Sequence, residues 1–319
     1  MKKILITGIT GFAGSHLAEL LLQDSDVEIF GTYVSEKNIH AIESLRQRIQ
    51  LRKVELTNYE EVENLISEIM PDIIYHLAAL PSPADSFKNP ALYLQNNINA
   101  ELYLLEAVKT HELLQTKILI ISTSEVYGLV GQEDLPIDED TPLRPVSPYG
   151  VSKIAQDFLG LQYHLAYNLS IVRVRPFGHI GPRLSEQFAS SSFAKKIAEI
   201  EAGKREPILT VGNLDSRRDL TDVRDIVRAY KLLIEKGIVG DVYNLGSGIS
   251  YKTGYILTTL LSYSKTPIEI KTDTSLFRPN DIPELRCDNR KIKELTGWEP
   301  TVSLETSLQD TLDYWRKVI

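Results

Sequence analysis

The stretch Ile4-Leu5-Ile6-Thr7-Gly8-Ile9-Thr10-Gly11-Phe12-Ala13-Gly14 begins as an apolar run and ends in a glycine-rich turn. The run predicts a buried parallel strand, and residues 15–23 that follow have the periodicity of a helix. Glycines spaced G-x-x-G-x-x-G at this junction allow a sharp turn and close approach of the backbone to a pyrophosphate. Amide groups at the start of a helix favour negative charge. The stretch therefore predicts a dinucleotide site at Gly8, Thr10, Gly11, Phe12, Ala13 and Gly14; the alternative is a plain strand–helix turn.

Apolar runs alternate with amphipathic segments along the rest of the chain, which is typical of a doubly wound parallel sheet of the Rossmann type. The predicted strands are residues 4–7, 27–32, 51–56, 73–77, 118–121, 171–175 and 241–245. The predicted helices are residues 15–23, 60–70, 90–109, a segment starting at 147–148, 191–202 and 217–235.

The second half of the chain is more irregular, and we expect it to form a smaller α/β lobe interleaved with the first. The predicted division is a dinucleotide-binding domain over 1–176, completed by about 220–247. Residues 177–219 and 248–319 would then form a substrate-binding lobe that closes over the ends of the strands.

Composition excludes several classes of protein. The 319 residues are 43% hydrophobic and 24% charged, as in ordinary globular proteins. A formal net charge of −8 argues against a nucleic-acid partner, whose binding surface is basic. The single Cys287 allows neither an intrachain disulfide nor a cysteine zinc site. Without an apolar stretch of about 20 residues or a secretory signal, we expect a cytoplasmic protein with no membrane partner.

Residues at the carboxyl ends of the predicted strands offer further cofactor contacts. A carboxylate after the second strand indicates NAD and an arginine indicates NADP, but residues 31–35 contain neither, so either coenzyme is possible. Small residues after the fourth strand would let a cofactor lie against the backbone. The expected contacts here are Thr32, Glu55, Leu56, Leu77, Ala78 and Ala79.

Tyr149 and Lys153 are candidates for proton transfer. Ser147-Pro148 is typical of a helix start, and residues four apart lie on one helix face. An ammonium group near a phenol lowers the pKa of the phenol, which would suit Tyr149 to move a proton. A tyrosine and a lysine at this spacing can equally form an ordinary exposed face. Residues 122–128 leave the carboxyl end of the fifth strand, where parallel sheets bind ligands.

Taken together, these motifs resemble the extended short-chain dehydrogenase/reductase family. The resemblance is carried by Gly8-x-x-Gly11-x-x-Gly14, Thr123, Tyr149-x-x-x-Lys153 and Arg218-Asp219. Residues 175–182, 212–219 and 221–225 are most similar to the GDP-4-keto-6-deoxymannose reductases and the GDP-mannose 4,6-dehydratases. The family implies an NADP- or NAD-dependent enzyme that acts on a nucleotide sugar, with a GDP-linked hexose as substrate, and a homodimer.

The same resemblance implies the catalytic roles. Thr123 would hydrogen-bond the sugar oxygen at the reacting carbon, and Tyr149 would give that oxygen a proton or remove one. Lys153 would hold the cofactor ribose and lower the pKa of Tyr149. Glu125 matches a carboxylate that drives loss of water in the dehydratases. Reductases of the family can also have a glutamate at this position. Alternatively, Glu125 is a solvated acid or a helix-capping acid.

Binding roles follow in the same way. Tyr93 and His179 would contact the cofactor, although a lone histidine can equally be structural. The expected substrate-binding residues are Ser124, Gly178, Lys196, Arg218 and Arg278. The two arginines would bind the diphosphate of the substrate. Alternatively, these arginines are surface residues paired with Asp219 and Asp281. Gly178 departs from the family pattern, which has asparagine there, and this puts the identity of the sugar in doubt.

These features favour a reductase of the 4-keto group of GDP-4-keto-6-deoxy-D-mannose. The chain lacks the longer loop after residue 183 that the dehydratases carry. The alternatives are a GDP-mannose 4,6-dehydratase, a sugar-nucleotide 4-epimerase, or a cofactor-binding regulator without catalysis.

Overall fold

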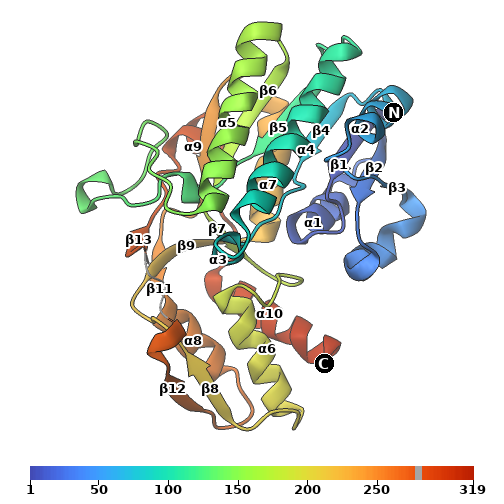
Figure 1. Ribbon diagram of the computed structural model, residues 1–319. Coiled ribbons are helices and arrows are strands. Elements are labelled where there is room, and N and C mark those ends of the chain that lie inside the picture. The colour runs from blue at the N-terminus through green and yellow to red at the C-terminus, as the bar shows by residue number, and fades with distance from the viewer. Residues whose placement is uncertain (277–281) are drawn as a thin grey trace.

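The computed structural model describes residues 1–276 and 282–319, and its largest element is a parallel sheet of seven strands (Figure 1). In spatial order these are β10 (Val242–Leu245), β6 (Ser170–Pro176), β5 (Lys117–Ile121), β4 (Ile73–His76), β1 (Lys2–Thr7), β2 (Val27–Tyr33) and β3 (Ile49–Lys53). Every pairing in this sheet is parallel. The predicted doubly wound sheet is confirmed, including its distant seventh strand. Strand β3 ends at Lys53, three residues before the predicted end.

Helices cover both faces of the sheet, as the continuous apolar strands require. On one face lie α1 (Phe12–Leu21) and α7 (Val223–Lys236), which share a core with Leu17, Val227 and Tyr230. On the other lie α2 (Tyr59–Ile69), α4 (Pro90–Thr110) and α5 (Pro148–Tyr167), whose core includes Leu104 and Tyr163.

The order of the strands places a switch point between β1 and β4. From β1 the chain moves outward to β2 and β3, and then returns to β4 and continues in the opposite direction. Ligands of open α/β sheets bind at the carboxyl ends of strands beside such a point. Both the glycine-rich turn after β1 and residues 77–79 after β4 lie there.

A smaller lobe lies below the carboxyl ends of these strands in Figure 1. Strand β9 (Arg217–Asp222) is paired with β7 (Gly178–Ile180), β11 (Ser250–Lys252) and β13 (Glu284–Leu285), and β8 (Ile208–Val211) pairs with β12 (Glu269–Thr272). Helices α6 (Ala189–Glu201), α8 (Thr253–Ser262) and α10 (Leu304–Val318) pack around a third core. The exact division into two domains remains a prediction.

The remaining helices of the described residues include four 3-10 helices, labelled η. The full set is η1 (Glu36–Arg48), α3 (Pro83–Ser86), η2 (Ser124–Val126), η3 (Gln132–Asp134), η4 (Thr274–Leu276) and α9 (Arg290–Thr296). Within residues 1–276 and 282–319, none of the helices has the length and apolar character needed to cross a bilayer.

The predicted helix over residues 217–235 is wrong in its first part. Residues 217–222 form strand β9, and the helix begins only at Val223. The side chain of Asp222 accepts a hydrogen bond from the amide of Arg224 (2.8 Å) and thereby caps α7. The carboxylate of Asp219 accepts from the amides of Ser247 (2.8 Å) and Gly248 (2.8 Å), which ties β9 to the loop after β10.

Candidate active site

The turn between β1 and α1 has the close backbone contacts expected of a dinucleotide cradle. Gly8 has φ +69°, and a Cβ atom there would lie 3.0 Å from the Cα of Ala78. A Cβ atom on Gly14 would lie only 2.5 Å from the carbonyl oxygen of Gly8. Gly11 is the N-cap of α1, and no side chain caps this helix end. The amides of the first helical turn are therefore suited to a pyrophosphate, so the residues present fit the expected cofactor.

The neighbouring residues hold this turn in place. The Thr32 hydroxyl accepts from the amide of Gly8 (3.2 Å), and the Thr7 hydroxyl accepts from the amide of Ala78 (3.1 Å). Leu77 and Ala79 flank Ala78 beside the same turn. Leu56 is buried, whereas the exposed Glu55 accepts from the Thr57 hydroxyl (2.8 Å). Contacts of all these residues with a cofactor remain a prediction.

His179 lies directly against the glycine-rich turn. Its ring stacks on that of Phe12, with centroids 5.6 Å apart and planes 4° from parallel. Its Nδ1 is 3.2 Å from the carbonyl oxygen of Phe177, and burial lowers the pKa of the imidazole. Strand β7 of the small lobe is thus placed beside the dinucleotide cradle.

Helix α5 starts as the sequence predicts and presents Tyr149 and Lys153 on its buried face. The hydroxyl of Ser147 accepts from the amide of Gly150 (3.0 Å), and Pro148 occupies the first turn. Tyr149 and Lys153 are 8% and 4% exposed. The alternative of an ordinary exposed face is therefore excluded.

The Tyr149 phenol meets residues from two other elements. The Thr123 side chain lies close enough to lower the pKa of the phenol, and Glu125 and Tyr93 lie close enough to act on it electrostatically. Thr123 follows β5 and its hydroxyl also accepts from the amide of Glu125 (3.3 Å). Three segments far apart in sequence, at residues 93, 123–125 and 149, therefore converge at the carboxyl end of β5, two strands from β1 in the sheet. Ser124 is buried next to them.

The expected effect of Lys153 on Tyr149 is not found. Burial, followed by the proximity of Glu125 and Tyr93, raises the pKa of the Tyr149 phenol, while Thr123 opposes this. The Lys153 ammonium instead donates to the Oε1 atom of Gln156 (2.6 Å). Tyr149 therefore carries its proton at neutral pH, as a proton donor requires.

A buried polar network that the sequence analysis missed surrounds Lys153. The Nε2 atom of Gln156 lies 3.5 Å from that of His76, whose Nδ1 is 3.0 Å from the Thr7 hydroxyl. Burial lowers the pKa of Lys153 to about 8, and Glu101 on α4 and Asp157 on α5 oppose this shift. Gln156 could have been found, because it lies three residues after Lys153 on the same helix face.

The expected substrate residues lie in the small lobe. Arg218 is half-buried on β9 and donates to the carbonyl oxygens of Arg217 (2.9 Å) and Ile282 (2.7 Å). Lys196 is half-buried on α6, where burial and then Arg205 lower its pKa. Arg278, and the alternative partner Asp281, lie outside the described residues. The carboxylate of Asp219 is engaged by loop amides, as described above.

Gly178 sits where β7 approaches β9. A Cβ atom there would lie 2.6 Å from the Cδ2 atom of Leu220 and 2.9 Å from the carbonyl oxygen of Asp219. Glycine at this position is explained by the close approach of the two strands. An asparagine would require the strands to separate.

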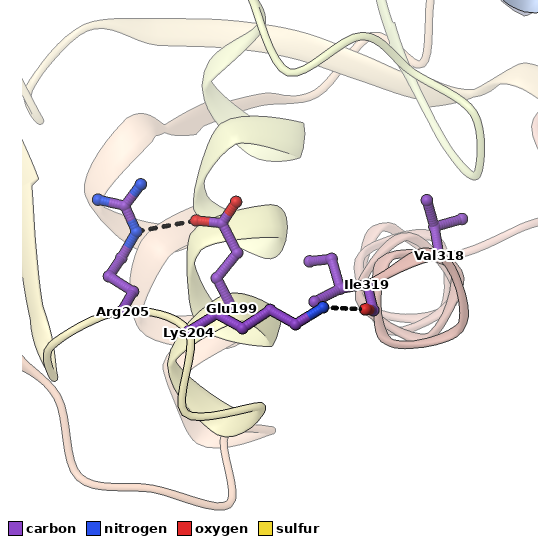
Figure 2. A pocket seen from close by; sticks show the side chains of 5 residues that line it. All are labelled: Glu199, Lys204, Arg205, Val318 and Ile319. Atoms are coloured by element: carbon purple, nitrogen blue, oxygen red, sulfur yellow. Dashed lines mark hydrogen bonds and ion pairs between the residues drawn. The ribbon is translucent and has the colours of Figure 1, made fainter.

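Figure 2 shows a surface hollow lined by Glu199, Lys204, Arg205, Val318 and Ile319. Lys204 donates to the backbone oxygen of Ile319, and Arg205 donates to Glu199 (2.8 Å). The hollow lies at the carboxyl ends of α6 and α10, in the part of the small lobe that is remote from α5 in Figure 1. It is separate from the candidate active site.

The family model described as GDP-mannose 4,6 dehydratase matches residues 5–311. The chain belongs to this family. The resemblance to the extended short-chain dehydrogenases/reductases is thereby confirmed.

Curated relatives of this family member span nearly the whole chain. It is 31% identical to the GDP-6-deoxy-D-mannose reductase of Pseudomonas aeruginosa, with 98% of this chain and 97% of the relative covered. It is also 31% identical to the GDP-mannose 4,6-dehydratase of Yersinia enterocolitica, with 96% and 91% covered.

Solved structures give the same result for the fold. A structure of RMD from Pseudomonas aeruginosa complexed with NADPH is 30% identical, with a TM-score of 0.87 over all of both chains. The UDP-glucuronic acid 4-epimerase from Bacillus cereus, in complex with UDP-glucuronic acid and NAD, is 31% identical, with a TM-score of 0.88 and 99% and 100% covered.

Proposed function

We propose that this family member is an NAD(P)H-dependent reductase of the 4-keto group of GDP-4-keto-6-deoxy-D-mannose. The observation that carries the proposal is the buried, protonated Tyr149 beside Thr123 and next to a fitting dinucleotide cradle. Full-length similarity to a reductase of this substrate class supports it. The intact site argues against a regulator without catalysis.

The residues of the site divide the reaction between them. A bound NADPH or NADH supplies a hydride to the keto carbon. Tyr149 donates its proton to the keto oxygen, so that C=O becomes CH–OH. Thr123 hydrogen-bonds the same oxygen and stabilises the negative charge that develops there. Lys153 holds the cofactor ribose.

Two other activities share this arrangement. Glu125 lies near Tyr149, where a dehydratase needs a carboxylate, and dehydratases are among the full-length relatives. Sugar-nucleotide epimerases are among the structural neighbours. The reductase consumes coenzyme, whereas the other two regenerate it within each turnover. Coenzyme balance is therefore the property that separates these activities.

Both coenzymes remain candidates. Solved relatives are complexed with NADPH or with NAD. In this chain β2 ends with Thr32 and Tyr33, where neither a carboxylate nor an arginine marks the preference.

The expected role of Arg218 can be tested by its removal. If its guanidinium binds the diphosphate, Arg218→Ala should raise the Michaelis constant for the sugar nucleotide about 10-fold or more, the value of one charged hydrogen bond. The Michaelis constant for the coenzyme should change little. Arg205→Ala, in the remote hollow of Figure 2, is the matched control. A larger effect on the coenzyme would assign Arg218 to the other pocket.

We also propose that the protein forms a homodimer through α4 and α5. Val151, Phe158 and Leu165 on α5 are 46%, 49% and 72% exposed and lie seven residues apart, so they form one apolar stripe along the helix. Leu92 on the neighbouring α4 is exposed as well. A stripe with this repeat suits helix–helix packing against the same face of a second copy.

Sedimentation velocity tests this proposal. The unchanged protein should sediment as a dimer, and Phe158→Lys should shift it to a monomer. Ile238→Lys, at an exposed apolar residue of the loop after α7, should leave the dimer intact. A monomer before substitution would refute the proposal.

We further propose a cytoplasmic location, because the buried, unpaired Cys287 suits a reducing compartment.

A further inference from the structure

The Lys153 ammonium is buried and makes one hydrogen bond within the part of the chain that the structure describes. Its Nζ atom donates to the Oε1 atom of Gln156, one turn further along α5, at 2.6 Å. Lys153 is 4% exposed and Gln156 is 0% exposed, so bulk water does not compete for this contact. An ammonium group has three N–H donors, and two of them therefore remain for a ligand.

The charge of Lys153 fixes the orientation of the Gln156 amide. An ammonium group can only donate, so the amide atom that faces it must be the oxygen. The amide nitrogen then points the other way and lies 3.5 Å from the Nε2 atom of His76 on β4. Because an amide nitrogen can only donate, the Nε2 atom of His76 has to be the acceptor and carries no proton.

His76 therefore has one defined tautomer. Burial, followed by the charge of Lys153, lowers the pKa of the imidazole to about 3, so the ring is neutral at pH 7. Its single proton must lie on Nδ1, which is 3.0 Å from the Thr7 hydroxyl on β1 and donates to that oxygen. The same oxygen accepts from the amide of Ala78 (3.1 Å), and these two donors fill its two lone pairs.

These hydrogen bonds form a continuous chain from α5 through β4 to β1. At its far end, Ala78 lies against the glycine-rich turn, where a Cβ atom on Gly8 would be 3.0 Å from the Cα of Ala78. The opposite tautomer of His76 would point an N–H group at the amide nitrogen of Gln156. The amide could avoid this contact only by turning its nitrogen towards Lys153, which would remove the acceptor of the ammonium.

We propose that Gln156 and His76 are positioning residues for Lys153. His76, as its Nδ1–H tautomer, holds the Gln156 amide with its oxygen towards the ammonium, and this contact fixes the place from which Lys153 binds the cofactor ribose. The inference rests on the proposed use of a nicotinamide cofactor. Neither positioning residue takes part in the proposed transfer of a proton from Tyr149.

The tautomer can be measured directly. Nitrogen NMR of the full-length protein labelled with ¹⁵N-histidine, at pH 7 and without ligands, distinguishes protonated from unprotonated ring nitrogens. The chain has six histidines, and the signals lost in His76→Asn are those of His76. We expect the proton on Nδ1. A proton on Nε2 would overturn the proposal, whatever the protein binds.

A pair of substitutions at Gln156 tests the effect on Lys153. Gln156→Met has a similar length and no acceptor, and it should bind NADPH or NADH about 10-fold more weakly or worse, as the loss of a hydrogen bond to a charged group implies. Gln156→Glu keeps an acceptor for the ammonium and should bind within a few-fold of the unchanged protein. Its second oxygen faces His76, so the NMR signal should show the proton moved to Nε2.

Gln162→Met is the matched control, because Gln162 is exposed on the same helix. A fluorescence titration with each coenzyme, without sugar, should give the unchanged affinity for this variant. Unchanged affinity in Gln156→Met would overturn the proposal. Equal weakening in Gln156→Met and Gln156→Glu would overturn it as well, since that pattern indicates a purely structural role. If the unchanged protein bound neither coenzyme, the proposed function would fail too, whereas the other outcomes leave it standing.

Discussion

Replacement of Tyr149 by phenylalanine should lower turnover about 100-fold or more and leave the dissociation constant of NADPH within a few-fold. The size is that of a group that transfers a proton. Tyr149 is buried, its phenol meets Thr123, and its raised pKa keeps the proton available for transfer. Loss of the hydroxyl removes that proton and changes little of the packing. Initial rates with saturating substrates and a fluorescence titration with NADPH measure the two effects.

The control for this substitution lies on the same helix. Tyr163 donates its hydroxyl hydrogen bond to Glu106, four turns beyond Tyr149, and Tyr163→Phe should keep turnover within a few-fold. If Tyr149→Phe also kept turnover within a few-fold, Tyr149 would have no part in the chemical step.

Gly14→Ala should lower the affinity for NADPH about 10- to 100-fold. The added Cβ atom would lie 2.5 Å from the carbonyl oxygen of Gly8 and 2.9 Å from the Cα of Ile9, so the turn between β1 and α1 must open. The amides of the first turn would then be displaced from the pyrophosphate, and one or more charged hydrogen bonds of about 1.5–3 kcal/mol each would be lost.

Gly254→Ala is the control for this prediction. Gly254 lies in α8, where a Cβ atom would meet the carbonyl oxygen of Leu214 at 3.4 Å, an ordinary contact. NADPH affinity should not change in this variant. Unchanged affinity in Gly14→Ala as well would show that the cofactor does not bind at this turn.

Local sequence patterns were enough to predict the large parallel sheet and the start of α5. The alternation of apolar runs and helices predicts all seven strands of the large sheet, and Ser147-Pro148 correctly marks the start of α5. These features depend on neighbours within one turn or one strand. The small lobe was predicted less well, because β9 is held by pairing with β7, β11 and β13 from distant segments.

The surroundings of the candidate catalytic residues could be predicted only in part. The spacing of Tyr149 and Lys153 places them on one face, but their electrostatics depend on burial and on α4, which packs against α5. The Lys153 ammonium donates to Gln156, and burial raises the pKa of Tyr149. Likewise, the close contact of Gly178 with Leu220 exists only because β7 pairs with β9.

Incubation of the purified protein with GDP-mannose, and separately with GDP-4-keto-6-deoxy-D-mannose, each with and without NADPH or NADH, tests the proposed function most directly. The account predicts that reduced coenzyme is oxidised only in the presence of the keto sugar, in an amount equal to the keto sugar consumed. Consumption of GDP-mannose without net change in coenzyme would contradict it and identify the protein as a dehydratase.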